Sequence, residues 1–119
     1  MRDGTRARVA ATVAAATLKK SVGSVYDYDA STHRIMSVDI RNGQVNGFDH
    51  GTSTHFSGGG GGSLDFFDYE HSQHVQLALN GTSFSGFDYH TGQHFSGNVN
   101  GSSVTIFDHE TGSHHSYSV

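Results

Sequence analysis

The stretch from Gly86 to Val104 reads GFDYHTGQHFSGNVNGSSV, and diverged copies of it fill most of the chain. An aspartate marks each copy, and a histidine follows the aspartate six residues later. The five aspartates are Asp27, Asp49, Asp68, Asp88 and Asp108, and the five histidines are His33, His55, His74, His94 and His114. Self-similarity at a fixed spacing of about 20 residues is typical of a repeat architecture. The sequence therefore predicts five copies of one small structural unit.

Each copy holds two short runs of alternating residues separated by turn signals, which is the pattern of a β-hairpin. No copy has room for a helix between its strands, so successive strands are expected to be antiparallel neighbours in a meander. The predicted fold is mainly β, of the α+β class. An N-terminal helix precedes a ten-stranded antiparallel meander of five hairpin repeats, which curls or closes into a barrel around or against the helix.

The length of the turns decides which side chains share a face of the sheet. A two-residue first turn would put the β-branched Thr91 at positive φ, which is costly, whereas a three-residue turn ending in a left-handed Gly92 avoids this. The three-residue turn places Asp88 directly opposite His94. A second three-residue turn at 99–101 then keeps equivalent residues of successive repeats on the same face.

This register predicts an apolar face and a polar face. Phe87, Tyr89, Phe95 and their equivalents lie on the apolar face, and the five aspartates and five histidines lie together on the other. An antiparallel sheet with one solvated side needs such a division. Some apolar residues fall on the polar face in this register: Val25, Leu64, Phe66, Phe84, Val104 and Ile106.

The 119 residues are expected to form a single domain, 1–119, with the helix in residues 1–21 and the five repeats in residues 22–119. The chain has no Cys, which excludes disulfides and thiolate metal sites. In repeat two, the run Gly58–Gly62 replaces the second turn. Because the repeat continues on both sides of this run, we interpret it as a flexible loop inside the sheet rather than an engineered linker.

Residues 5–22 favour a helix, because the stretch is rich in Ala and lacks Gly and Pro. No residue from Val9 to Leu18 is charged, and a helix that is apolar all round is usually buried all round. The competing interpretation is a signal peptide cleaved near Ala14–Ala16, but its apolar core of about five residues is shorter than the usual ~7–15. We therefore expect a cytoplasmic protein that does not enter a membrane, with secretion as the minor alternative.

Charge divides the chain into a basic end and an acidic remainder. Residues 1–20 hold five Lys or Arg and one Asp, whereas residues 21–119 hold two Arg and ten acidic residues. A nucleic-acid-binding protein would spread basic residues over a face together with aromatics, so no nucleic-acid partner is expected. The basic helix is instead predicted to contact the acidic sheet of its own chain or that of a second copy, which would form a homo-oligomer.

The repeated Asp and His pairs suggest two kinds of chemistry. Imidazole and carboxylate groups bind Zn²⁺ and similar ions, and the candidate ligands are His109, His114, His115, Asp108, Asp88 and His94. Pairs spread along a sheet converge poorly on one ion, so cross-strand ion pairs are the simpler interpretation. Asp, His and Ser also suggest a catalytic triad, but five near-identical copies and the lack of a GxSxG motif argue against an enzyme. No cofactor is expected.

The clearest repeat contains Phe87-Asp88-Tyr89, then Thr91-Gly92, then His94-Phe95-Ser96-Gly97. This pattern resembles that of small uncharacterised bacterial proteins built from ~20-residue YDYxTGxHFSGxVNGxSV-type β-hairpin repeats. The resemblance covers about residues 22–119 and is weaker in repeats one and two. It implies a β-repeat fold and a bacterial source, and it implies no activity.

The predicted function is that of a non-enzymatic binding or scaffold domain. The alternative is a module that binds a metal ion through the Asp/His pairs or a small ligand through the aromatic face. Aromatic side chains in the mouth of a barrel can hold an apolar ligand, and exposed aromatic side chains can hold a sugar or a protein.

Overall fold

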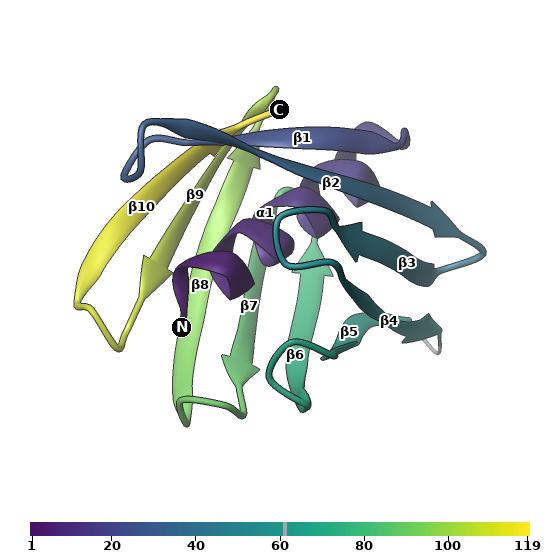
Figure 1. Cartoon of the computed structure of the whole chain (residues 1–119). Helices are drawn as coiled ribbons and strands as arrows, with labels where there is room; N and C mark the ends of the chain where they lie inside the picture. The colour runs from purple at the N-terminus through teal and green to yellow at the C-terminus, as the bar shows by residue number, and fades with distance from the viewer. Residues whose placement is uncertain (61) are drawn as a thin grey trace.

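The computed structural model describes residues 1–60 and 62–119, which form one helix and ten strands (Figure 1). Helix α1 spans Asp3–Leu18. The strands are β1 (Val22–Asp27), β2 (Thr32–Arg41), β3 (Gln44–Asp49), β4 (Thr54–Gly60), β5 (Ser63–Asp68), β6 (Gln73–Asn80), β7 (Ser83–Asp88), β8 (Gln93–Asn100), β9 (Ser103–Asp108) and β10 (Ser113–Ser118). The predicted order of one helix followed by five hairpins is confirmed.

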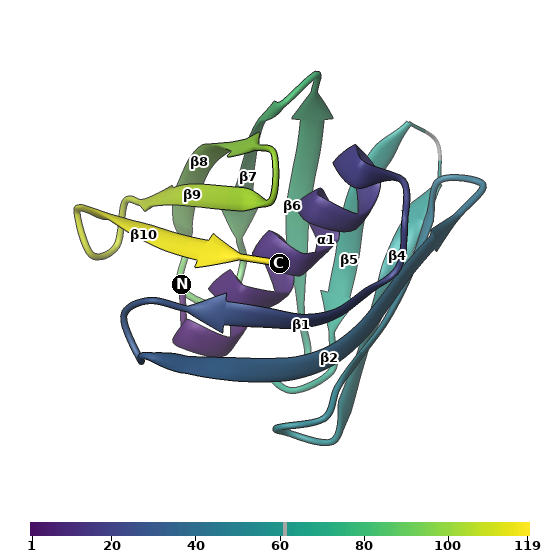
Figure 2. The ribbon, with the colours of Figure 1, turned by 90° about the horizontal axis from the view of Figure 1, so that it is seen from above.

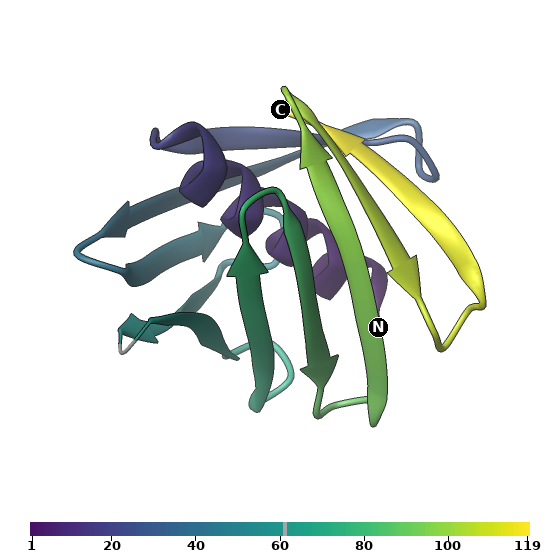
Figure 3. The ribbon, with the colours of Figure 1, turned by 180° about the vertical axis from the view of Figure 1, so that it is seen from behind.

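The strands close into an antiparallel barrel in which sequence neighbours pair throughout. Strands β1 and β10 complete the closure, with Tyr26 opposite Ser118 and Asp27 opposite Tyr117. Viewed from above, the strands surround helix α1, and the view from behind shows β6, β7 and β8 covering its far side (Figures 2 and 3). The meander is thus closed rather than only curled, and a closed sheet has no edge strand that needs protection.

Helix α1 fills the barrel because it is narrow and mostly apolar on every side. All residues from Thr5 to Ala15 are buried. Alanine combines the highest helix propensity with a small side chain, which leaves space for the rings of Phe56, Phe66 and Phe95 in the same core. The predicted burial of Val9–Leu18 is confirmed for Val9–Ala15, whereas Ala16, Thr17 and Leu18 at the end of the helix are only partly buried. Within the described residues, no helix combines the length and the apolar character needed to cross a membrane.

The first turn of the repeat is longer than predicted. Asp88 pairs with Gln93 and Phe87 pairs with His94, so four residues connect β7 to β8. The predicted pairing of Asp88 with His94 is therefore wrong. The four-residue loop places Gly92 at φ 70° and does not require a positive φ at Thr91, so it avoids the same strain as the predicted three-residue turn while shifting the register by one residue.

The second turn is shorter than predicted. Asn100 pairs with Ser103, which leaves a two-residue turn. Its first residue, Gly101, has a φ of 61°. A two-residue turn that begins with a left-handed glycine matches the twist of the flanking strands.

Together these turns invert the first strand of each repeat. A shift of one residue exchanges the two faces of a strand, so the five aspartates point into the barrel while the histidines six positions later are exposed outside. Most apolar residues that did not fit the predicted faces are in fact buried in the interior: Val25, Phe66, Phe84, Val104 and Ile106. The predicted faces are correct for the second strand of each repeat and wrong for the first.

Glycines on the inner wall make room for phenylalanine rings of the neighbouring strand. The cross-strand pairs are Gly47 with Phe56, Gly86 with Phe95 and Gly97 with Phe84. A Cβ atom at Gly86 would lie 2.5 Å from the Phe95 ring and 1.9 Å from the carbonyl oxygen of Gln76. The rings therefore occupy the space that side chains would fill, and the barrel axis remains free for the helix.

The substitution Gly86→Ala is expected to destabilise the barrel by about 1–3 kcal/mol, because the new methyl group overlaps backbone that cannot move without breaking the sheet. Urea unfolding followed by circular dichroism measures this. Gly23→Ala is the control, since a Cβ atom at Gly23 meets nothing within 4 Å. Equal unfolding midpoints for the two variants would contradict the packing argument.

The first three glycines of the run in repeat two belong to the sheet, so the interpretation as a loop is wrong for Gly58–Gly60, while Gly62 lies in the turn before β5. Gly58–Gly60 lie in β4, and Gly58 pairs with Phe66. A Cβ atom at Gly58 would lie 2.3 Å from the carbonyl oxygen of Asp65. Glycine at this position therefore lets β4 and β5 approach closely, and Gly61 lies outside the described residues.

Candidate functional site

The five repeated aspartates stabilise the turns that follow them. In every repeat, the carboxylate accepts a hydrogen bond of 2.9 to 3.1 Å from the backbone N–H two residues later. This is the Asx-turn, in which an aspartate side chain replaces a backbone acceptor. Because β1, β3, β5, β7 and β9 run in the same direction, these carboxylates lie at one end of the barrel, where all are buried. We refer to Asp27, Asp49, Asp68, Asp88 and Asp108 as the aspartate ring.

Arg8 of helix α1 binds two members of the aspartate ring. Its Nε atom donates to Asp49 at 3.0 Å and its Nη1 atom donates to Asp68 at 2.9 Å. Glu70 accepts a hydrogen bond from Nη2. Burial opposes the charged form of Arg8, but the hydrogen bond to Glu70 and the charge of Asp68 outweigh it and raise the pKa of the guanidinium. The positive charge of the helix is therefore held inside the barrel by its own carboxylates.

A second ion-pair network surrounds Asp108. Its carboxylate accepts hydrogen bonds of 2.9 Å from the amino group of Met1 and of 2.9 Å from Nη1 of Arg6. The Nε atom of Arg6 donates to the hydroxyl of Tyr117 at 3.3 Å, and burial raises the pKa of this phenol to about 12. Burial alone would raise the pKa of Asp108, but the hydrogen bonds from Met1, Glu110 and Arg6 outweigh it and lower this pKa.

The Asp108 network predicts acid sensitivity. A carboxyl group whose pKa is lowered in the folded state stabilises the fold above its unfolded-state pKa of about 4, and this contribution is lost as the pH falls through the lower folded-state value. The free energy of unfolding in urea is therefore expected to decrease as the pH is reduced below about 4. Asp108→Asn should lower stability at pH 7 and make this pH dependence shallower. An unchanged acid profile in the variant would contradict the coupling.

The predicted metal ligands do not converge on one point. Asp88 and Asp108 face the barrel interior, whereas His94, His109 and His114 are exposed. His115 is buried, and its Nδ1 atom contacts the carboxylate of Asp29. Among the described residues, the grouped potential ligands are Asp68, Glu70 and His71, whose ligand atoms lie within 4.8 Å of one another. Arg8 already binds both of these carboxylates, and metal binding by the predicted residues stays a prediction.

On the outer wall, each repeat forms a small aromatic cluster. The aromatic residue before the ring aspartate contacts the Tyr or His after it and the histidine across the hairpin. Ring centroids lie 4.7 to 5.0 Å apart in edge-on arrangements. Such contacts stabilise the hairpin. Despite them, the clusters keep three tyrosines more than half exposed: Tyr28, Tyr69 and Tyr89.

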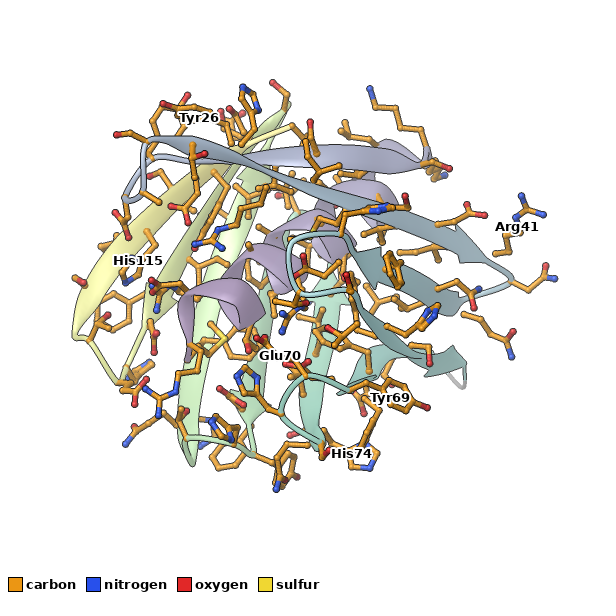
Figure 4. The ribbon with its side chains drawn as sticks, in the orientation of Figure 1. Tyr26, Arg41, Tyr69, Glu70, His74 and His115 are labelled. Carbon is orange, nitrogen blue, oxygen red and sulfur yellow. The ribbon has the colours of Figure 1, made fainter. Side chains whose placement is uncertain are left out.

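Hollows lie on the outer wall where one repeat meets the next. The largest of the four described here, of about 870 Å³, extends over β1, β2, β3 and β4. It is lined by His55 and Ser57 of β4, Asn46 of β3, and Tyr69 from the loop after β5. Figure 4 shows Tyr69 pointing away from the barrel, whereas Glu70 beside it lies near the helix.

The same positions line hollows at the next two junctions. Three of these positions belong to one repeat: the histidine six residues after the ring aspartate, the residue two places after that histidine, and the residue three places before the ring aspartate. The fourth position is the residue directly after the ring aspartate of the next repeat. In the hollow of about 270 Å³ they are His74, Gln76, Asp65 and Tyr89. In the hollow of about 510 Å³ they are His94, Ser96, Ser85 and His109. We call these three sites the junction hollows.

A fourth hollow, of about 380 Å³, lies where repeat one meets repeat two. Three of the four equivalent positions line it, and they are occupied by His33, Ile35 and His50. Arg34 lines it as well. Arg34 donates to Asp27 of the aspartate ring at 2.9 Å. This site therefore shares the position of the junction hollows but differs in charge.

Comparisons with known proteins add no assignment. No family model, no curated protein and no solved structure matches this chain. Its candidate sites therefore have to be judged by their own geometry and chemistry.

Sequence reasoning found the histidines of the junction hollows but not the hollows themselves. Asn46, Asp65 and Ser85 gave no signal, because their position three residues before the ring aspartate is not occupied by one residue type. The contribution of Tyr69 or Tyr89 to the preceding repeat depends on how neighbouring hairpins are offset. Aligning the repeats shows that the four lining positions are equivalent from one repeat to the next. Only the correct register of the strands shows that they meet at one hollow.

Proposed function

We propose that this protein is a non-enzymatic binding domain, in which the helix-filled barrel is a rigid scaffold and the junction hollows are the binding sites. The observation that carries the proposal is the recurrence of a hollow lined by the same four repeat positions at three successive junctions. Concave sites that combine aromatic and polar groups are typical of ligand binding.

The position of the carboxylates favours binding over catalysis. Asp49, Asp68 and Asp108 are engaged by arginines of the helix and lie inside the barrel. Asp88 accepts hydrogen bonds from the N–H of His90 and the hydroxyl of Thr91. A general base must reach the proton that it removes from a substrate, and these carboxylates are directed toward the helix and the turns instead.

The metal-binding alternative has weaker support, because the aspartates and histidines of each repeat lie on opposite faces of the wall. We retain the bacterial, cytoplasmic assignment as part of the proposal. Burial of helix α1 supports it, since a signal peptidase acting near Ala14–Ala16 would remove the core of the barrel. Assembly with a second copy stays a prediction, and Arg6 and Arg8, being buried against their own barrel, are not exposed to such a partner.

The test is a titration of ¹⁵N-labelled protein, followed by two-dimensional NMR, with neutral oligosaccharides, acidic oligosaccharides, a proline-rich peptide and Zn²⁺. We expect at least one oligosaccharide or the peptide to shift resonances of the outer wall at two or more junction hollows, whereas shifts with Zn²⁺ alone would favour the metal-binding alternative. Shifts confined to the aspartate ring or to the N-terminal residues would overturn the proposal. So would a panel that shifts nothing, or the appearance of a cleaved oligosaccharide or peptide.

A further inference from the structure

We infer that the junction hollows bind a neutral polysaccharide, with successive hollows contacting successive parts of one chain. This inference rests on the proposed function and names its ligand. Each hollow offers side chains that donate and accept hydrogen bonds, next to an exposed tyrosine ring at two of the three sites.

The polar lining suits a ligand rich in hydroxyl groups. The largest hollow includes Asp39, Asn46 and His55 together with five serine and threonine side chains: Ser21, Ser37, Ser53, Thr54 and Ser57. Hydroxyl, amide and imidazole groups can each donate and accept hydrogen bonds, as sugar hydroxyls also can. A mainly apolar ligand would leave these groups without partners and lose affinity.

The aromatic side chains provide the apolar part of the site. Tyr69 and Tyr89, which line the first two junction hollows, are both 54% exposed. A pyranose ring has a C–H face that packs against an aromatic ring while its hydroxyls remain available at the edge. Tyrosine suits this role, since it combines a large apolar surface with a polar tip.

Charge argues for a neutral ligand. The residues that line the three junction hollows include no Lys or Arg and include the acidic Asp39 and Asp65. The barrel region, residues 21–119, holds ten acidic residues against two arginines. An acidic polysaccharide or a nucleic acid would therefore be repelled, because anionic polymers need basic contacts.

The spacing of the sites favours a polymer. Equivalent positions of successive repeats are two strands apart, or about 9.6 Å across a sheet, and somewhat more on the convex outer wall. This distance is comparable to the length of a disaccharide unit. A long chain could thus occupy neighbouring hollows together, and the second contact would form at high effective concentration.

A proline-rich peptide is the other extended ligand that aromatic surfaces bind, and it uses grooves lined by several aromatic rings. Fourteen residues line the largest hollow, and nine of them are polar. Rings are supplied by three of the fourteen: Phe48, His55 and Tyr69. The polar majority therefore favours the glycan, and the peptide serves as a competing arm of the test.

The experiment compares Tyr69→Ala and Tyr89→Ala with Tyr28→Ala. Tyr28 is the matched control, because it follows a ring aspartate in the same way and is 55% exposed, yet it lines none of the four hollows described here. The probes are cellohexaose, chitohexaose and mannohexaose, with the corresponding disaccharides and an oligogalacturonate of the same length. Binding is measured by NMR titration, and folding by circular dichroism.

We expect at least one neutral hexasaccharide to bind more tightly than its disaccharide and the oligogalacturonate not to bind. Tyr69→Ala or Tyr89→Ala should weaken hexasaccharide binding about tenfold, equivalent to about 1.4 kcal/mol, and the double variant should weaken it further. Tyr28→Ala should change it little.

Three results would overturn the glycan assignment: no shift with any neutral hexasaccharide, equal losses in Tyr28→Ala and Tyr69→Ala, or preferred binding of the acidic chain. A proline-rich peptide that binds at the junction hollows would overturn the glycan while leaving the proposed binding function intact. If neither these probes nor Zn²⁺ shifts the outer wall, the binding function fails as well.

Discussion

A chain lacking residues 1–20 is expected to lose cooperative folding and to aggregate. Every residue from Thr5 to Ala15 is buried in the barrel, so the deletion removes the centre of the core rather than an appendage. The rings of Phe56, Phe66 and Phe95 would then face an open channel. A domain of this size has a net stability of about 5–15 kcal/mol, which cannot compensate for the loss of that whole interface.

The measurement is urea unfolding followed by circular dichroism, together with binding of a dye that reports exposed apolar surface. A synthetic peptide of residues 1–20, added in trans, should restore part of the cooperative transition. A truncated chain that remains monomeric and unfolds cooperatively would show that the barrel does not need the helix.

A point substitution tests the same packing without removing the segment. Ala11→Leu should destabilise the protein by about 1–3 kcal/mol, because a fully buried site has no space for the larger side chain. Ala16→Leu is the control, since Ala16 lies near the end of the helix and is only half-buried. Equal unfolding midpoints would mean that the barrel interior is loosely packed around the helix.

The helix and the hairpin repeats could be predicted from the sequence because their signals are local. The uncharged stretch from Val9 to Leu18 indicated burial on every side, and the repeat of about 20 residues indicated hairpins. The register could not be fixed in the same way. It depends on whether a turn has two, three or four residues, and one residue of difference exchanges the faces of a strand.

A signal for the correct register was nevertheless present in the sequence. An aspartate that begins a turn often accepts hydrogen bonds from the backbone ahead of it, and Asp88 does so in the loop that ends at Gly92. Recognising that role would have favoured a loop that starts after Asp88. The buried position of Phe84 and Ile106, which the predicted register placed on the polar face, points to the same correction.

The ionic contacts between helix and barrel were only partly predictable. Opposite charges at the two ends of the sequence suggested that the basic helix contacts an acidic sheet, and the structure places that contact within one chain. The choice of partners required three dimensions, because Asp49 and Asp68 come from different repeats and meet at Arg8 only after the barrel has closed.

Replacing Arg8 with Met is expected to destabilise the fold by about 3–5 kcal/mol, the usual cost of leaving a buried charge without its partner. Arg8 is fully buried, and its guanidinium binds Asp49, Asp68 and Glu70. Methionine keeps most of the apolar volume of the side chain, so the loss reports the missing charge rather than a cavity. The measurement is the free energy of unfolding in urea at pH 7 and low salt.

Two further variants separate this ion-pair network from general surface charge. Arg41→Met is the matched control, because the Arg41 side chain is 80% exposed at the end of β2 (Figure 4) and pairs there with Asp39. Exposed pairs contribute little, so little change is expected. In the triple variant Arg8→Met, Asp49→Asn and Asp68→Asn, much of the lost stability should return, since neutral amides remove the unpaired charges while retaining polar groups at the turns.

If Arg8→Met and Arg41→Met unfold at the same urea concentration, the aspartate ring does not depend on the helix for its charge balance. If the triple variant is less stable than Arg8→Met alone, the aspartates stabilise the barrel chiefly through their turns and not through the arginine.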